Sequence, residues 1–380
     1  MRPRTRELNI RIGQLDPGPL NAITDVPGVR VGHTTLIEGT GKLIPDRGPI
    51  RTGVTAILPH EGDLFLEKVT AAVLRINGFG EVTNSEQVHE MGFIEGPIML
   101  TNTFNVPRVA DAVIDWALAR STVMGIDTWG ISPVVAETSD LWLNDIRGRH
   151  VDREHVFHAI DSATGGPVEE GAVGGGTGMI CYDFKGGIGT SSRRLPSRLG
   201  GFTVGVLAQT NFGWRPQLTI DGVPVGRELE DYQPRSRQFL AGVDPRPVDT
   251  GSVIVVLATD APCSHRQLTR LAVRAQNGLA RTGSHTGNTS GDFVVAFCTT
   301  RRKRHFNEEL TSTVEQIVET GELINHLFWA VVEATEEAVL NSLFKADTMI
   351  GRDDRVIPGL PIEETVRLMK RYGHSDVHLP

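Results

Sequence analysis

The chain has 380 residues, of which 39% are hydrophobic and 22% charged, a composition typical of a soluble globular protein with a large core. Its net charge of −8 argues against nucleic acid as a partner, and its three scattered cysteines argue against a disulfide framework and favour a cytoplasmic setting. The charged residues 1–15 do not resemble a signal peptide, and no apolar run approaches membrane-spanning length.

The first half of the chain predicts short strands, turns and one clear helix. Apolar residues recur at helical spacing over about 105–119, which indicates an amphipathic helix. The predicted strands before residue 224 are 29–33, 53–59, 172–182 and 201–210. Residues 224–250 form the most linker-like stretch.

The second half alternates strong strand and helix signals. Continuous apolar runs predict buried strands at 253–259 and 293–298. A helix begins near Ser264, where Gln267 completes a capping-box pattern, and a long helical region is predicted over about 311–345. Strands and helices therefore come in clusters rather than in strict βαβ alternation. This order favours a layered α+β fold over a doubly wound parallel sheet.

The pair Gly251-Ser252 lies between a proline-rich stretch and the apolar run 253–258. This arrangement suits a self-cleaving precursor, because the serine hydroxyl can attack the glycine carbonyl and glycine tolerates the strained backbone that this requires. After cleavage, Ser252 holds both a nucleophile and a free α-amine that can serve as its base. Taken alone, the pattern also fits a serine at a turn before an ordinary core strand.

Three further segments hold polar residues among apolar ones. Glu137 follows an apolar run, and its carboxylate is suited to pair with a substrate ammonium. Asn211 follows another strand, and its amide can donate to an oxyanion. Ser290 and Asp292 are two residues apart, so both side chains can point to one face and reach a nucleophile or an amine. Singly, each also fits an ordinary surface carboxylate, turn or polar loop.

Other short motifs in the sequence do not identify a binding or catalytic site. The glycine-rich stretch 172–178 lacks the Lys-Ser/Thr of a P-loop, which favours close backbone packing as its use. Ser342 and Lys345 match Ser-x-x-Lys without the companion motifs, and no Gly-x-Ser-x-Gly occurs. His89-Glu90 lacks the second histidine of a zinc helix, so we predict no metal and no cofactor.

Taken together, these segments resemble the family of the L-aminopeptidase D-amidase/esterases (DmpA) and the β-peptidyl aminopeptidases, over nearly the whole chain. The resemblance rests on several long segments in the correct order, namely 23–33, 172–178, 186–192, 251–258 and 290–292. It implies a four-layer αββα sandwich, similar to the N-terminal-nucleophile hydrolases but connected differently. It also implies one catalytic domain over 1–380, cut between Gly251 and Ser252 into chains 1–251 and 252–380, and usually a tetramer of αβ units.

The resemblance also implies roles for the polar residues. Ser252 matches the nucleophile, Asn211 the group that stabilises the oxyanion, and Glu137 the carboxylate that holds the free amine of the substrate. Ser290 and Asp292 match a Ser-Gly-acid pair near the nucleophile, where some relatives have Glu in place of Asp. Some relatives are expected to have tyrosine near the position of Ser139, a departure that leaves the substrate preference open.

The leading hypothesis is a self-processing serine aminopeptidase or amidase that acts on short peptides, amino-acid amides or esters. One alternative is an acyltransferase of the ornithine acetyltransferase type, although that family uses threonine where this chain offers Ser252. The other alternative is a non-catalytic homologue that binds amines or only assembles. The preference among α-, β- and D-configured residues is not readable from the sequence.

Overall fold

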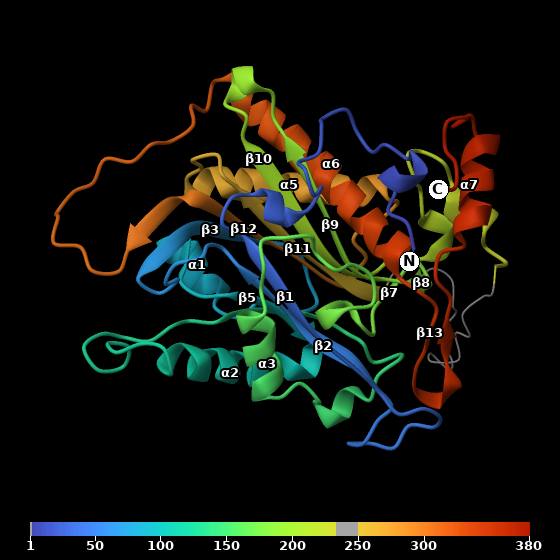
Figure 1. The fold of residues 1–380 in the computed structure, drawn as a ribbon, viewed down its shortest axis with the longest axis horizontal. Helices are drawn as coiled ribbons and strands as arrows, with labels where there is room; N and C mark the ends of the chain where they lie inside the picture. Colours follow the sequence, from blue (N-terminus) through green and yellow to red (C-terminus); the bar gives the residue numbers. More distant parts are fainter. Residues whose placement is uncertain (1, 233–249) are drawn as a thin grey trace.

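Two β-sheets pack face to face, and each is covered on its outer side by helices (Figure 1). The computed structural model describes residues 2–232 and 250–380. These ranges form the four layers of an αββα sandwich, so the predicted α+β fold class is confirmed. Both termini lie at the same side of the molecule, beside the C-terminal helix α7 (Figure 1).

The first sheet has four strands in the order β1-β2-β5-β6. Neighbouring strands run antiparallel except for β5 and β6, which are parallel. Helices α2 and α3 contact its outer face. The bounds are β1 Arg30–Glu38, β2 Ile50–Leu58, β5 Ile98–Asn102, β6 Val134–Thr138, α2 Val106–Leu118 and α3 Arg153–Asp161.

The second sheet has six strands in the order β4-β3-β12-β11-β10-β9. Its central pair, β11 and β12, is parallel, and helices α5 and α6 cover its outer face. The bounds are β3 Glu67–Gly78, β4 Phe93–Ile94, β9 Gly187–Arg194, β10 Thr203–Asn211, β11 Thr250–Thr259, β12 Thr289–Arg304, α5 His265–Arg281 and α6 Glu322–Lys345.

Shorter elements lie around the sandwich. A two-stranded hairpin, β7 and β8, packs near the end of β10, and a second hairpin, β13 and β14, follows α6. Their bounds are β7 Ile180–Cys181, β8 Phe184–Lys185, β13 Met349–Ile350 and β14 Val356–Ile357. The remaining helices are α1 Ser85–Met91, α4 Val225–Glu228 and α7 Ile362–Arg371.

The apolar run of β11 is buried on both faces. Ile254 and Val256 join the core between the two sheets, whereas Val253 and Val255 join the core beneath α5 and α6. A strand enclosed on both sides reads as a continuous hydrophobic run rather than an alternating one. This explains the continuous apolar run by which the sequence predicts β11.

Most predicted elements are confirmed within one to three residues at their ends. The helix expected over 105–119 is α2, the strands at 201–210 and 253–259 are β10 and β11, and 293–298 lies within β12. The capping box at the start of α5 is also confirmed, with the backbone N–H of Gln267 donating to the hydroxyl of Ser264 at 3.3 Å.

The strand predicted over 172–182 is wrong for most of its length. Gly174–Gly176 forms a 3-10 turn, and only Ile180–Cys181 is extended. The turn packs between the two sheets. The N–H of Gly175 donates to the hydroxyl of Thr55 in β2, and a Cβ on Gly175 would lie 2.2 Å from Oε1 of Gln209 in β10. The predicted use of this stretch in close backbone packing is therefore confirmed.

The long helix predicted from about 311 begins only at Glu322. The preceding connection projects away from the body of the molecule (Figure 1), with Val314 and Val318 more than half exposed. Within 311–321 only Ile317 is buried, and a short segment that buries so little apolar surface gains too little to form a helix. In the linker-like stretch, α4 occupies 225–228, and 233–249 lies outside the described residues.

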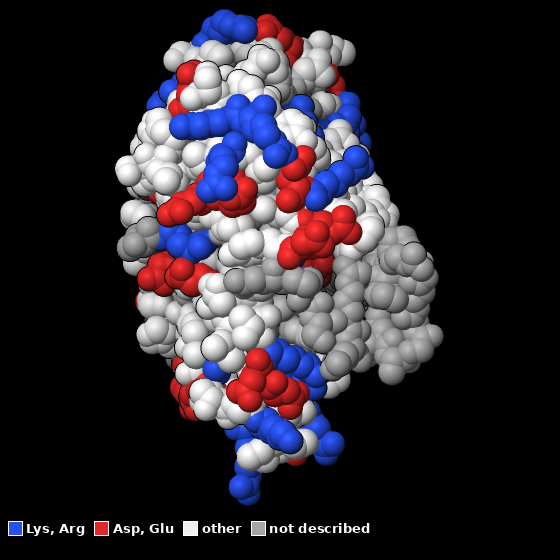
Figure 2. Space-filling model, turned by 90° about the vertical axis from the view of Figure 1, so that its right-hand side faces the viewer, with Lys and Arg blue, Asp and Glu red and all other residues white. Residues whose placement is uncertain are grey.

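The surface carries charges of both signs. The face shown in Figure 2 mixes Lys and Arg with Asp and Glu and has no broad basic area. In the described ranges, no helix combines the length and apolar character needed to cross a membrane.

Candidate active site

The predicted site residues of the second sheet meet where β10 ends and β11 and β12 begin. Ser252, the third residue of β11, is paired with Asn211 on β10 and with Gly291 on β12. Ser290 and Asp292 lie on either side of Gly291. The tertiary structure thus brings together four residues that are up to 81 positions apart in the sequence.

The hydroxyl of Ser252 lies against the peptide bond that precedes it. Its Oγ donates a hydrogen bond to the carbonyl oxygen of Gly251 at 2.7 Å, and the residue is only 6% exposed. Strand alternation puts its side chain on the same face as Ile254, toward the first sheet. The hydroxyl of Ser252 is therefore held next to the carbonyl group that the predicted self-cleavage would require.

Gly251 is required by a close backbone approach. A Cβ at this position would lie 2.2 Å from the carbonyl oxygen of Asn211 and 2.6 Å from Cα of Phe212. Its φ is not in the left-handed region, so the constraint is steric rather than conformational. The absence of a side chain is what lets the start of β11 lie so close to the end of β10.

The side-chain amide of Asn211 is held from both ends. Its Oδ1 accepts from the backbone N–H of Ile180 at 2.9 Å, and its Nδ2 donates to the carbonyl oxygen of Ser139 at 3.0 Å. These partners fix which end of the amide carries the nitrogen. Directly opposite residues on antiparallel strands share a face with Cβ atoms about 5 Å apart. The Asn211 nitrogen therefore lies on the Ser252 side of the sheet.

Ser290 and Asp292 form a buried pair, each only 1% exposed. The hydroxyl of Ser290 donates to Oδ1 of Asp292 at 2.6 Å, which confirms that both side chains share one face. That face is the one beneath α5 and α6, because Val294 follows at the same alternation. Since Ser290 is paired with Gly251, the two side chains flank the backbone of the junction rather than the hydroxyl of Ser252.

Glu137 reaches the site from the first sheet. It lies inside β6 rather than after a strand, is 4% exposed, and accepts a hydrogen bond from the hydroxyl of Thr103 at 2.5 Å. A Cβ on Gly80 would lie 2.7 Å from Oε1 of Glu137 and 3.2 Å from Cα of Gly291. The carboxylate is thus within about 6 Å of Gly291, the strand partner of Ser252. Burial raises the pKa of Glu137.

Three groups around the site were missed by the sequence analysis. Asp140 is fully buried between Asn102 and Asn144, and burial raises its pKa to about 6. Thr103 holds Glu137, and Lys185 is buried in the hairpin next to Asn211. No spacing or composition signal marks these residues, because only the packing of loops from both sheets brings them to the site.

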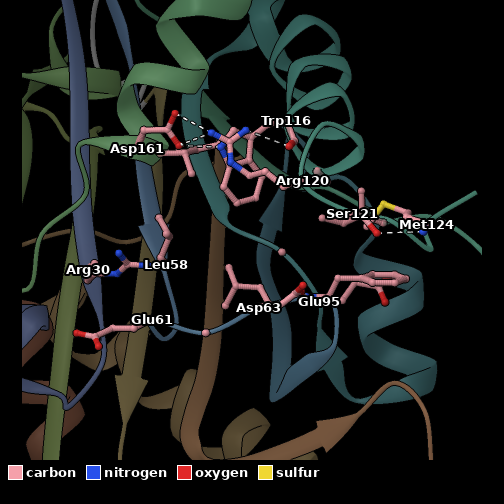
Figure 3. Close-up of a pocket in the computed structure, with 17 residues that line it drawn as sticks. Arg30, Leu58, Glu61, Asp63, Glu95, Trp116, Arg120, Ser121, Met124 and Asp161 are labelled. Carbon is pink, nitrogen blue, oxygen red and sulfur yellow. Dashed lines mark hydrogen bonds and ion pairs between the residues drawn. The ribbon is translucent and has the colours of Figure 1, made fainter.

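A separate cavity of about 370 Å³ lies where β1 begins and β2 ends, beside the last turns of α2 and α3 (Figure 3). Arg120 donates to both carboxylate oxygens of Asp161 at 2.9 Å, and the indole N–H of Trp116 donates to the same carboxylate. None of the predicted site residues lines this cavity.

Comparison with known proteins gives consistent matches over nearly the whole chain. The chain is 45% identical to the β-peptidyl aminopeptidase BapA of Sphingosinicella xenopeptidilytica over 370 residues, which is 97% of this chain and 91% of that protein. Among solved structures, the PH0078 protein from Pyrococcus horikoshii OT3 is 48% identical, with a TM-score of 0.91 over 98% of this chain and all of that one.

A second solved structure bears on the fold. The L-aminopeptidase D-Ala-esterase/amidase from Ochrobactrum anthropi is 40% identical, with a TM-score of 0.89 over the full length of both chains. It is described as a prototype for the serine aminopeptidases and a new variant of the Ntn hydrolase fold. The sequence model of peptidase family S58 matches residues 21–357. This chain belongs to peptidase family S58.

Proposed function

We propose that this protein is a serine aminopeptidase or amidase that becomes active by cutting itself between Gly251 and Ser252. The observation that carries the proposal is the hydroxyl of Ser252, held 2.7 Å from the carbonyl oxygen of Gly251 in a chain of peptidase family S58. The names of its relatives, a β-peptidyl aminopeptidase and an L-aminopeptidase D-Ala-esterase/amidase, favour short peptides, amino-acid amides or esters as substrates.

Self-cleavage is an acyl shift followed by hydrolysis. Oγ of Ser252 bonds to the carbonyl carbon of Gly251, and the C–N bond breaks as the nitrogen takes up the hydroxyl proton. Water then hydrolyses the resulting ester. The products are the chains 1–251 and 252–380, the second with a free α-amine on Ser252. An N-terminal amine has an unperturbed pKa of roughly 7.7–8.0, suited to a base near neutral pH.

The cut does not separate the protein into two domains. The second fragment supplies β11 from Ser252 onward, together with β12, α5 and α6, whereas β3 and β10, which flank its strands, belong to the first. The fragments share one sheet and its core, so they are expected to stay together as a single catalytic domain. A tetramer of such αβ units and a cytoplasmic location complete the proposal.

In substrate turnover, Oγ of Ser252 attacks the carbonyl carbon of the N-terminal residue and its α-amine accepts the proton. Asn211 donates to the tetrahedral oxyanion, and losing one such donor typically costs about 100- to 1000-fold in rate. The amine returns the proton to the leaving group, and water hydrolyses the acyl-enzyme. These steps use only side chains, one amine and water.

The remaining residues orient the reactants. Ser290 and Asp292 flank the backbone at residue 252, where they are suited to hold the new α-amine rather than the hydroxyl. Glu137 supplies a carboxylate near Gly291 that can pair with the free amine of the substrate. A substrate held by its amine presents only its first peptide bond to Ser252, which accounts for exopeptidase action.

Mass spectrometry of the purified protein tests this function. Wild type should give a fragment that begins at Ser252, and Ser252→Ala should remain one chain without activity. Ser197→Ala is the control, because Ser197 is an exposed serine between β9 and β10, at the far end of β10 from Asn211, and its replacement should leave cleavage and turnover intact. A fully active protein that remains a single chain would contradict the proposal.

A further inference from the structure

Lys185 is a fully buried lysine that the proposed reaction does not use. It lies at the end of β8 with 0% exposure, and its ammonium donates to three carbonyl oxygens, those of Gly186 at 2.7 Å, Met179 at 2.8 Å and Gly176 at 3.2 Å. Within 2–232 and 250–380, no carboxylate forms an ion pair with it. Among the described residues, its charge is therefore balanced mainly by backbone dipoles, with an electrostatic contribution from Cys181.

Such a charge is expensive to keep in a protein interior. An ammonium without a counter-ion loses its hydration, and the three carbonyl groups replace only part of it. Burial accordingly lowers the pKa of Lys185 to about 7. A methionine has nearly the same shape and would avoid the charge penalty, but it could not donate to these three carbonyl groups, so the lysine also stabilises the hairpin.

The ammonium is connected to Asn211 through a single peptide group. The carbonyl of Met179 accepts from Lys185 at 2.8 Å, and the N–H of the same peptide, which belongs to Ile180, donates to Oδ1 of Asn211 at 2.9 Å. A peptide whose oxygen faces a cation is a stronger donor at its nitrogen, because linked hydrogen bonds polarise one another. The amide of Asn211 is polarised in turn, which strengthens its own N–H groups as donors.

We propose that Lys185 is a positioning residue for the oxyanion: its ammonium, acting through the Met179–Ile180 peptide, orients and polarises the amide of Asn211. The inference rests on the proposed function, since it assumes that Asn211 stabilises an oxyanion formed at Ser252. It adds a second source of positive charge, remote from the substrate. The buried lysine thus acts on the transition state while it contacts neither the substrate nor Ser252.

The size of the effect follows from simple electrostatics. When Lys185 is protonated, its unit charge, on the order of 10 Å from an oxyanion at an effective dielectric constant of about 20, changes the rate about 10-fold. Because the oxyanion exists only in the transition state, the loss should appear in kcat. Binding of the substrate amine at Glu137 should not change, so KM should stay within about 2-fold.

Steady-state kinetics of Lys185→Met and Lys185→Gln test the proposal. Both variants remove the charge, and both should lower kcat about 10-fold while self-cleavage still gives an end at Ser252. The matched control is Lys303→Met. Lys303 also donates to a backbone carbonyl, that of Met91 at 2.9 Å, but it lies at the far end of β12 from Gly291. The control should keep wild-type kcat.

A double-mutant cycle separates a relay through Asn211 from a general loss of order. In an Asn211→Ala background, the change Lys185→Met should have almost no further effect on kcat, because the group that transmits the charge is gone. An equal 10-fold loss in both backgrounds, an unchanged kcat, or failure of both Lys185 variants to fold would overturn the proposal. If Asn211→Ala alone costs nothing, the proposed function of Asn211 fails instead.

Discussion

Replacing Gly251 with alanine tests the packing that aligns Ser252, the proposed nucleophile, with Asn211, the proposed oxyanion donor. The new Cβ would lie 2.2 Å from the carbonyl oxygen of Asn211, whereas ordinary contact begins at 3.4 Å. Both clashing groups are backbone, so the start of β11 must move by about 1 Å, and a misplacement of that size typically costs about 100-fold in rate. Overpacking of this kind also destabilises by about 1–3 kcal/mol.

The assay is the conversion of newly made precursor into two fragments, followed on a denaturing gel after a synthesis pulse. Gly251→Ala should slow conversion about 100-fold, and any processed enzyme should turn over substrate more slowly. Gly166→Ala is the control, since the nearest atom to its Cβ would be 4.0 Å away and its φ is ordinary. Conversion of Gly251→Ala at the wild-type rate would refute the view that this close approach sets the reactive geometry.

Three other outcomes are expected. Glu137→Gln should weaken transition-state binding of free-amine substrates by about 2–5 kcal/mol yet leave self-cleavage intact, and Glu86→Gln, at an exposed position, is the control. If wild type hydrolyses acetylated and free-amine substrates equally well, Glu137 does not bind the substrate amine. Burial lowers the pKa of the His33 imidazole to about 4, so the unfolded state takes up a proton before the folded state as pH falls below 6.5. In uncut Ser252→Ala chains, the free energy of unfolding should therefore drop between pH 7 and 5 by about 2 kcal/mol more than in chains that also carry His33→Asn. Parallel curves of unfolding free energy against pH for the two proteins would contradict this. A metal chelator should leave activity unchanged, and loss restored by zinc or manganese would overturn the site assignment.

Local sequence patterns predicted the elements whose stability is decided by their own residues. The run 253–258 is apolar at every position and became a strand enclosed on both faces. Ser264 and Gln267 satisfy the first turn of α5 by themselves, which makes this boundary predictable. The strand predicted over 172–182 was wrong because contacts with both sheets determine the backbone conformation of its glycines. Likewise, the segment before Glu322 has a helical pattern but buries only Ile317, which is too little apolar surface to stabilise a helix.

The sequence by itself determined the fold class, the Gly251-Ser252 junction and the polar residues suited to act there. Only the tertiary structure decided what those residues face: the Ser290–Asp292 pair flanks the backbone of the junction, Glu137 approaches from the opposite sheet, and Lys185 is joined to Asn211 through one peptide. The physical reason is the distance along the chain over which each kind of interaction acts. Propensity and alternation act over a few neighbouring residues, whereas burial, charge and hydrogen bonding at the site arise between segments that meet only when the two sheets pack together.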